Sequence, residues 1–236
     1  MQLNDIRTLQ GSLELVSGLH IGAGNQEMHI GGLDNPMIKH PYTQEPYIPG
    51  SSLKGRMRSL LEWRAGVVGE CAGKPVSARA LRELQGAKRV AAEQIARLFG
   101  LSGDADDDTA TRLGPTRLSF WDCALARDWL AERQPGELLT EAKSENLIDR
   151  IRGVAEHPRQ TERVPAGARF DFRLTVKQLD GDPAELLEVV LAGLKLLELD
   201  GIGGSGSRGY GKIRFAGLRL DGEDIQARFD ATRPFA

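Results

Sequence analysis

The order of the periodic segments in this 236-residue sequence predicts an α+β domain. Apolar and polar residues alternate from Phe170 to Val176, which indicates a half-buried strand. Two other segments, after Pro49 and after Pro183, carry apolar residues at helical spacing. With shorter strands before, between and after them, the order is β-α-β-β-α-β. That is the order of a ferredoxin-like (RRM-like) core, a four-stranded antiparallel sheet with two helices on one face.

The first half of this core is predicted as follows. Residues 7–16 form the first strand, with Leu13 and Leu15 alternating with polar neighbours. A helix follows residues 49–52, where a serine is placed to cap it. Residues 116–125 form the second strand, through Leu118 and Phe120.

The second half begins with the alternating strand, residues 169–177. Asp182 and Pro183 then open the second helix as N-cap and first residue. Residues 212–220 form the last strand, and Gly217 interrupts its alternation, which suggests a β-bulge.

We expect one domain over residues 1–236, with insertions at about 19–48, 64–112 and 126–168. The middle insertion carries at least one helix, residues 88–99. Loops of this length in a compact domain are usually functional or disordered.

Composition excludes several classes of protein. The net charge of −2 rules out a polycationic protein, so any anion site must be a local patch. The sequence has no apolar run of membrane-spanning length and no secretory signal, and it has two cysteines without a zinc spacing. We therefore expect a cytoplasmic protein whose thiols pack as small apolar groups.

A glycine-rich run, residues 201–211, contains six glycines in eleven residues. It matches G-x-G-x-x-G, but a helix precedes it and a strand follows, the reverse of a dinucleotide-binding fingerprint. Its free amides could face a phosphate chain. A tight helix-to-strand turn is the alternative. The candidate RNA contacts here are Gly203, Gly204, Ser205, Gly206, Ser207 and Arg208.

A second candidate is the segment 50–58. It fails as a P-loop, because Arg56 and Met57 follow Gly55 where Lys and Ser or Thr are required. It still begins a helix whose amides and dipole suit a phosphate. The candidate contacts are Ser51, Ser52, Lys54, Arg56 and Arg58, and an ordinary amphipathic surface helix is the alternative.

Arginines without lysines gather in residues 150–169, among them Arg152 and Arg159. Guanidinium groups favour bidentate phosphate contacts or stacking on bases, although surface salt bridges would explain the segment equally well.

Two titratable residues stand out in the first insertion. Asp34 lies in the loop of residues 31–36, where a turn is its ordinary interpretation. His20 follows the first strand and could equally be a structural histidine. RNA supplies its own nucleophile, the 2′-hydroxyl, so one carboxylate that carries a proton or ligates a metal could suffice for cleavage.

Together these motifs resemble the RAMP superfamily, and within it the backbone subunit of type III-A (Csm) CRISPR effector complexes. The resemblance covers nearly the whole chain. Five segments carry it in the same order: residues 18–24, the Asp34 loop, residues 48–62, the block of residues 145–163, and residues 201–211.

The resemblance implies that copies of the chain form a filament along a guide RNA (crRNA), together with other subunits of the Csm complex. A thumb-like hairpin within residues 140–165 would wedge into the guide–target duplex. Asp34 falls on the catalytic aspartate, which cuts target RNA with a divalent metal ion, Mg²⁺ or Mn²⁺. His20 falls on a functional histidine position, and residues 51–58 fall in the guide-binding segment.

Two other functions stay open. One is a RAMP endoribonuclease that processes guide RNA precursors with a histidine, and the other is a purely structural filament subunit in which Asp34 is a turn residue. Aromatic residues make up only 6% of the chain, so we expect backbone recognition of RNA and little base stacking on the sheet.

Overall fold

The computed structural model describes residues 1–24, 35–101, 107–134 and 136–235. Its central sheet has the strand order β2-β5-β1-β6-β7, and every adjacent pair is antiparallel. These strands are β1 (Leu3–Leu15), β2 (Leu118–Phe120), β5 (Arg169–Leu179), β6 (Ile213–Leu220) and β7 (Glu223–Asp224).

The pairings fix the order and relative directions of the strands. Both β1 and β2 are antiparallel to β5, so they are parallel to each other with β5 between them. In the same way, β5 and β6 flank β1. The predicted bulge is confirmed, because the β1–β6 register shifts between Gln10 and Ser12 and Gly217 has φ of 62°.

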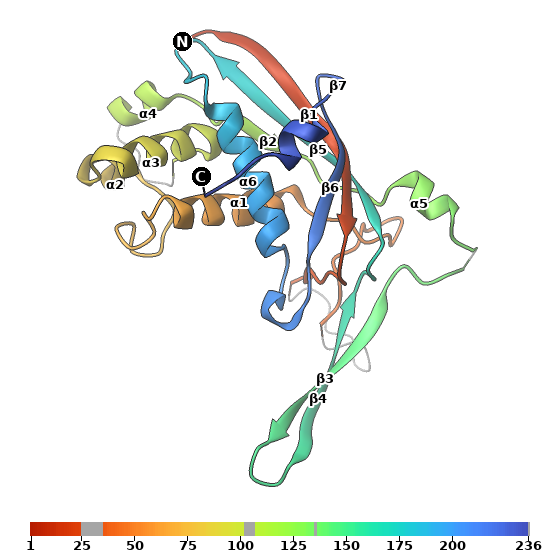
Figure 1. Ribbon diagram of the computed structural model, residues 1–236. Coiled ribbons are helices and arrows are strands. Elements are labelled where there is room, and N and C mark those ends of the chain that lie inside the picture. Colours follow the sequence, from red (N-terminus) through yellow and green to blue (C-terminus); the bar gives the residue numbers. More distant parts are fainter. Residues whose placement is uncertain (25–34, 102–106, 135, 236) are drawn as a thin grey trace.

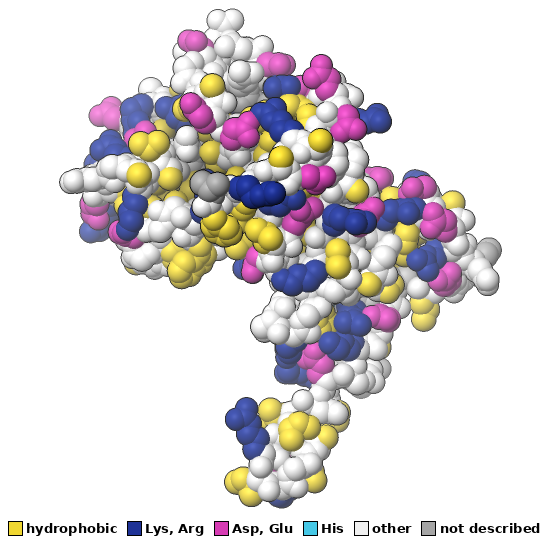
Figure 2. All heavy atoms as spheres, in the orientation of Figure 1, with side chains coloured by type: hydrophobic (Ala, Val, Ile, Leu, Met, Phe, Trp, Pro, Cys, Tyr) yellow, Lys and Arg dark blue, Asp and Glu magenta, His cyan; other side chains and the backbone are white. Residues whose placement is uncertain are grey.

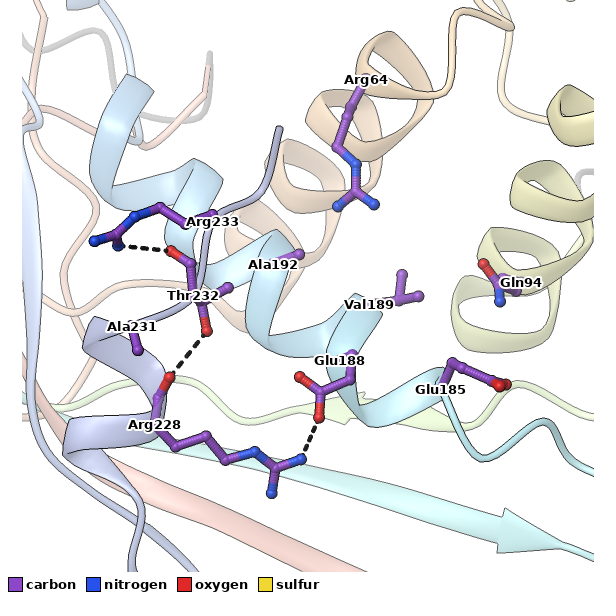
Figure 3. A pocket seen from close by; sticks show the side chains of 10 residues that line it. All are labelled: Arg64, Gln94, Glu185, Glu188, Val189, Ala192, Arg228, Ala231, Thr232 and Arg233. Carbon is purple, nitrogen blue, oxygen red and sulfur yellow. Dashed lines mark hydrogen bonds and ion pairs between the residues drawn. The ribbon is translucent and has the colours of Figure 1, made fainter. Parts of the chain in front are cut away.

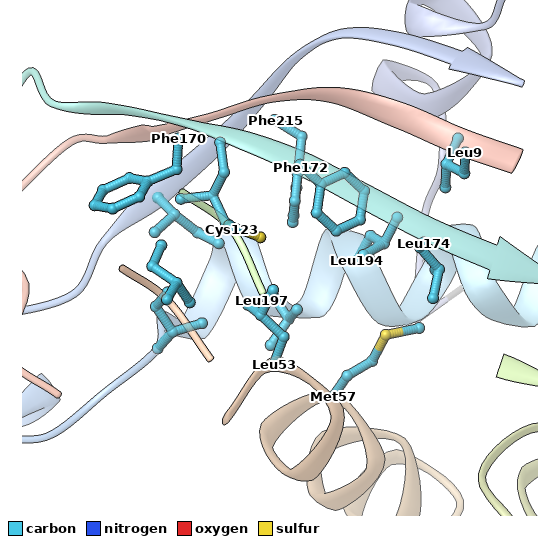
Figure 4. Close-up of a cluster of buried hydrophobic side chains, with 14 of the residues drawn as sticks. Leu9, Leu53, Met57, Cys123, Phe170, Phe172, Leu174, Leu194, Leu197 and Phe215 are labelled. Carbon is cyan, nitrogen blue, oxygen red and sulfur yellow. The ribbon is translucent and has the colours of Figure 1, made fainter. Parts of the chain in front are cut away.

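Two helices, α1 (Gly50–Arg64) and α6 (Leu186–Asp200), pack against each other and lie on one face of the sheet (Figure 1). Side chains of the sheet meet those of the helices in one hydrophobic core (Figure 4). Phe172 and Phe215, for example, lie 4.8 Å apart between ring centroids. The core includes Leu9, Leu13, Leu53, Met57, Phe170, Leu174, Leu194 and Leu197.

Three predicted boundaries are wrong in detail. Helix α1 begins at Gly50 with Pro49 as N-cap, and no serine caps it; the Asp122 carboxylate instead accepts the Gly50 amide at 2.7 Å. Helix α6 begins only after Glu185, because Asp182 is bonded elsewhere. Strand β2 covers three residues of the predicted ten.

The second insertion is helical, with α2 (Ala78–Glu83), α3 (Gly86–Phe99) and α4 (Asp107–Leu113) around a small apolar cluster of its own. The third holds α5 (Arg127–Ala131) and a two-stranded hairpin, β3 (Glu141–Asp149) with β4 (Val154–Arg163). This hairpin projects from the body, as Figure 1 shows. A last short helix, α7 (Gln226–Asp230), packs on β6.

A buried ion pair connects the helical insertion to the sheet. Arg117 is 1% exposed and donates to both carboxylate oxygens of Asp182, the closer at 2.6 Å. It also donates to the Leu113 carbonyl at 2.7 Å, and Arg97 lies 3.6 Å from the same carboxylate. Asp182 therefore serves packing rather than the start of α6.

Both thiols pack as expected. Cys123 is buried in the main core, and burial raises the pKa of its thiol to about 12. Cys71 packs against the small cluster, and burial raises its thiol pKa as well. Among the described residues, no helix has the length and apolar character that crossing a bilayer requires.

Candidate nucleic-acid interface

Residues 18–22 form the centre of the candidate site, because two separate segments, both far along the chain, bond to them. Leu19 exchanges two backbone hydrogen bonds with Val164, just past the hairpin, at 2.8 and 2.9 Å. The Gly18 carbonyl accepts the Gly211 amide at 2.9 Å, and the His20 carbonyl accepts the Gly204 amide at 3.0 Å. The glycine-rich loop and the hairpin base are thereby held on either side of the same strand end.

His20 has one ring nitrogen committed to the backbone. Its Nδ1 lies 2.7 Å from the Glu162 carbonyl oxygen, so Nδ1 carries the proton of this hydrogen bond. In the neutral ring Nε2 then keeps its lone pair. The ring lies beside Gly22 and Gly204, where an added Cβ would lie 3.6 and 3.8 Å from it, in ordinary van der Waals contact. His20 is half-buried, and Nε2 is the ring nitrogen that the Glu162 carbonyl leaves uncommitted.

The Glu162 side chain ties the first insertion to the hairpin base. It is almost fully buried and accepts hydrogen bonds from the Met37 amide (2.9 Å), Lys39 Nζ (2.5 Å) and Thr140 Oγ1 (2.6 Å). Burial acts to raise its pKa, but these three donors outweigh burial and the pKa lies below its ordinary value. The carboxylate is therefore ionised and fixes residues 37–39 beside His20.

The glycine-rich loop divides into a packed part and an open part. Gly201, Gly203 and Gly211 all have positive φ, and a Cβ on any of them would strike the backbone of Gly211, His20 or Ile202, respectively. No neighbour lies within 4 Å of a Cβ placed on Gly206. The tight-turn interpretation therefore holds for the first group, while the stretch 204–208 is exposed or half-buried and faces solvent.

Cations of the hairpin base and the loop surround one carboxylate, Glu145. Arg208 Nη1 lies 3.0 Å from it, Arg159 3.7 Å and Lys143 3.8 Å. The Tyr210 hydroxyl donates to it at 3.0 Å, and the Tyr210 ring has Lys143 on it at 4.3 Å. We call this cluster the junction; it consists of Lys143, Glu145, Arg159, Arg163, Arg208 and Tyr210.

The junction carries more positive than negative charge. Three of its four cations, Lys143, Arg159 and Arg208, lie near the single carboxylate Glu145, and Glu141 neutralises the fourth, Arg163, at 2.7 Å. Figure 2 shows Lys and Arg side chains gathered where the hairpin leaves the body. Arg159 and Arg208 are about half exposed, so their guanidinium groups can reach an added anion.

The predicted helix segment meets the same loop through Arg56. Its Nε donates to the Gly201 carbonyl at 3.4 Å, and it pairs with Asp200. Segments 50–58 and 201–211 therefore lie on the same side of the molecule. Lys54 has no ion pair with any described residue, which leaves its ammonium group available. Ser51 and Ser52 lie in the first turn of α1, where Ser51 is exposed.

The predicted role of Arg58 does not fit its environment. Its side chain is 13% exposed, and it donates to Glu62 at 2.9 Å and to the Val76 carbonyl at 3.1 Å. Because it faces the helical insertion, it is a packing residue in this structure.

Arg152 lies apart from the other predicted residues, at the far turn of the hairpin. It pairs with Asp149 at 2.5 Å and with Glu156. Exposed apolar side chains surround this turn, and they appear as the yellow tip in Figure 2. They are Leu147, Ile148, Ile151 and Val154.

Asp34 lies outside the described residues. Asn35, which follows it, bonds through its carbonyl to the Glu162 amide at 3.0 Å and bridges to Thr161 on β4. The described chain therefore resumes beside His20 and the hairpin base. Within the described ranges, no group of three or more His, Cys, Asp or Glu side chains could hold a metal ion.

Sequence reasoning missed Lys143, Glu145 and Tyr210 as members of the site. Glu141, Lys143 and Glu145 alternate along β3, so their side chains share one face of the hairpin. Across the strand, Glu145 faces Arg159 and Glu141 faces Arg163. This period of two was the signal that could have identified them.

An open cavity of about 490 Å³ lies away from the junction, between α1, α3, α6 and α7 (Figure 3). Arg228 there is paired with Glu188, and Arg233 donates to backbone carbonyls. None of the predicted site residues lines this cavity.

Comparison with known proteins identifies the family of this chain. The family model "RAMPs: RAMP superfamily" matches residues 12–214. The chain therefore belongs to the RAMP superfamily, and the resemblance inferred from its motifs is confirmed.

Individual relatives are more specific. The chain is 38% identical to "CRISPR system Cms endoribonuclease Csm3" of Methanothermobacter thermautotrophicus, over 90% of this chain and 84% of that protein. It is 41% identical to the protein of the same name from Streptococcus thermophilus, over 88% and 86%. It also resembles a chain of a crystallised Csm3–Csm4 subcomplex of a type III-A CRISPR-Cas interference complex. That match has a TM-score of 0.54 and 27% identity, over 93% of this chain and 80% of that one.

Proposed function

We propose that this chain is a guide-RNA-binding backbone subunit of a type III-A CRISPR interference complex and that it cleaves bound target RNA with Asp34. Its relatives are named CRISPR endoribonucleases, and a solved structural neighbour comes from a type III-A interference complex. The observation that carries the proposal is the convergence of the loop, the hairpin base and residues 18–22 around an excess of cations.

The guide would run along the junction and the open part of the glycine-rich loop. Arg208 and Arg159 would bind phosphate oxygens, because their guanidinium groups are exposed and held by one shared carboxylate. The amides of residues 204–207 and Ser205 would approach the backbone closely, since Gly204 and Gly206 carry no side chain. Lys54 and Arg56 would extend the contact onto α1.

Cleavage would use the target's own 2′-hydroxyl. Its oxygen attacks the adjacent phosphorus, its proton leaves to a base, and the departing 5′-oxygen takes up a proton, which gives a 2′,3′-cyclic phosphate and a 5′-hydroxyl end. Asp34 would accept the proton or ligate a metal. His20 Nε2, left free by the Nδ1 bond to Glu162, would hold a ribose hydroxyl or phosphate in position.

A divalent metal ion, Mg²⁺ or Mn²⁺, remains a proposal. The described residues supply no cluster of three ligands, so they do not by themselves fit such a site. The carboxylate of Glu162, whose backbone carbonyl bonds to His20, already accepts three hydrogen bonds.

The architecture supports the finer elements of the proposal. The interleaved order β2-β5-β1-β6 with α1 and α6 on one face supports a ferredoxin-like core. The projecting hairpin with its apolar tip would act as the thumb that separates guide and target. Copies of the chain in a filament, and other Csm subunits, would be its protein partners in the cytoplasm.

The test is cleavage by the assembled complex carrying Asp34→Ala. We expect target binding and assembly to persist while the cleavage rate falls roughly 10²-fold or more, the scale of losing a proton-transfer group. Asp5→Ala, an exposed aspartate on β1, is the matched control and should cut normally. Retained cutting by Asp34→Ala would favour a purely structural subunit or another nuclease in the complex.

The guide-processing alternative makes a different prediction. A chain of that kind would cut a hairpin precursor alone and would lose activity on His20→Ala. We expect the isolated chain to leave such a precursor intact.

A further inference from the structure

A row of four side chains crosses the sheet face opposite α1 and α6. Trp121 follows β2 and bonds through its amide to the Arg173 carbonyl. Arg173 on β5 pairs with Gln10 on β1, and Gln10 pairs with Arg219 on β6. Directly paired residues have Cβ atoms about 5 Å apart on one face. Trp121, Arg173, Gln10 and Arg219 therefore form a line, which we call the sheet row.

All four side chains of the sheet row are exposed, and Trp121 keeps 51% of its surface accessible. The Arg173 guanidinium lies 4.6 Å from the centre of the Trp121 ring. Neither Arg173 nor Arg219 has an ion pair with a described residue. The row thus presents an aromatic ring and two cations that form no ion pair with a described residue.

Four residues further along β1 from Gln10, the arginine charges on the same face are neutralised. Glu14 lies between Arg169 and Arg214, in the position that Gln10 occupies between Arg173 and Arg219. Arg214 pairs with Glu14 at 2.5 Å, and Arg169 pairs with Glu132 at 2.7 Å. Gln10 is a neutral amide where Glu14 is a carboxylate, so β1 offers Arg219 no partner of the kind that Glu14 gives Arg214.

Three members of the sheet row, Gln10, Arg173 and Arg219, line an open hollow of about 410 Å³. Its wall includes Asp171, a carboxylate beside the two arginines, and Gly217 at the β-bulge. The hollow therefore combines cations, an amide, a hydrogen-bond acceptor and, next to Arg173, an aromatic surface.

We propose that the sheet row is a second RNA site, separate from the junction, that binds a single strand through two phosphates and one stacked base. Arg173 and Arg219 bind successive phosphates, Trp121 stacks a base, and Asp171 accepts a ribose hydroxyl. Stacking plus phosphate contacts is the usual chemistry of single-strand binding without sequence preference. The proposal revises the expectation that bases would not stack on the sheet.

The same chemistry argues against an acidic protein segment as the ligand. An acidic protein segment would bring no ribose hydroxyl for Asp171 to accept and no base to stack on Trp121, whereas a single RNA strand brings both. The site is also distinct from the junction. Gln10 lies four residues, roughly 13 Å, from Glu14, and residues 18–22 lie beyond that.

The experiment measures binding of a fluorescein-labelled 12-nucleotide oligouridylate to the intact chain by anisotropy over a range of salt. We expect Arg173→Gln with Arg219→Gln to weaken binding about tenfold and to reduce the slope of log K against log salt by roughly 1.4, the value for two single-strand phosphates. Trp121→Leu should weaken binding at least fivefold and remove the quenching of tryptophan emission by RNA. Arg214→Gln, on the same face but already paired, should bind as the parent does.

Repeating the titration in a Lys143→Gln, Arg208→Gln background separates the two sites. Residual binding there that still depends on Arg173 and Arg219 supports the sheet row even if the junction proposal fails. If the sheet-row variants bind oligouridylate as tightly as Arg214→Gln, the proposal is wrong. A variant that keeps RNA affinity but fails to assemble with its protein partners would identify the row as a protein contact and equally overturn it.

Discussion

Two carboxylates of this chain, Asp182 and Glu145, each lie among several cations, but they have different roles. Asp182 is 5% exposed and holds Arg117, which is 1% exposed, at 2.6 Å. Glu145 is 13% exposed, but its partners Arg208 and Arg159 are 47% and 54% exposed at 3.0 and 3.7 Å. Where both partners are buried, the pair serves packing. Where the cations remain in solvent, the carboxylate positions them for a ligand.

The largest effect should follow from breaking the buried pair. Asp182→Ala leaves the Arg117 guanidinium buried without a counter-ion, and such losses cost about 3–5 kcal/mol. We expect urea unfolding to show a decrease of that size, while guide-RNA affinity per folded molecule stays unchanged. Asp5→Ala should unfold like the parent. A loss below about 1 kcal/mol would mean that Asp182 does not differ from Glu145 in the way described.

The glycine-rich loop gives the next largest contrast. Gly211→Ala places a Cβ against the Ile202 carbonyl at positive φ, so we expect it to destabilise the fold by roughly 1–3 kcal/mol. Gly206→Ala meets no neighbour and should leave the unfolding free energy within about 0.5 kcal/mol. Thermal unfolding of the two variants side by side tests the division of the loop. Equal stability would remove the distinction between its packed and open parts.

The stability that the buried Asp182–Arg117 pair contributes should depend on pH. Burial acts to raise the pKa of Asp182, but the Arg117 and Leu179 hydrogen bonds and the nearby Arg97 charge outweigh it, so the pKa is lowered. Stability from this ionised group is complete above the unfolded pKa of about 3.9 and is lost as the pH falls through the lower folded value. The difference in unfolding free energy between the parent and Asp182→Ala should therefore be constant from pH 7 to 5 and shrink below pH 4. A difference that grows on acidification would contradict this.

The smallest effect on stability is expected at the junction. Glu145→Gln removes a carboxylate whose cations are solvated, so unfolding should change by at most about 1 kcal/mol. Guide-RNA affinity should fall severalfold, because Arg208 and Arg159 lose the carboxylate that positions them for phosphate. Titration of labelled guide against the parent and Glu145→Gln measures the change in affinity. A tighter complex would show that Glu145 competes with phosphate more than it positions the two arginines.

The sequence predicted the core well because hydrophobic periodicity dominates there. The strand through Phe170 and Phe172 and the helix through Leu194 were recognisable from spacing alone. The predicted start of α6 was wrong because a tertiary bond replaces a local one. The sequence predicts Asp182 as a helix N-cap, but its carboxylate accepts hydrogen bonds from Arg117.

The site was predictable only in part. His20 and Arg208 lie in glycine-rich motifs that stand out in the sequence, and both are found beside the hairpin base. The partners Lys143 and Tyr210 were missed because they meet only through cross-strand register and through a loop that returns from α6. For the same reason, Gln10 could be assigned to the sheet row only once the strand register placed Arg173 and Arg219 on either side of it.

Photo-crosslinking of 4-thiouridine-substituted guide RNA in the assembled complex, followed by mass spectrometry of the attached peptides, would identify the residues that contact the guide. We expect the main crosslinks on residues 201–211, on the base of the β3–β4 hairpin and on the first turns of α1. Crosslinks concentrated instead on the helical insertion, residues 64–113, with none on the glycine-rich loop, would contradict this expectation.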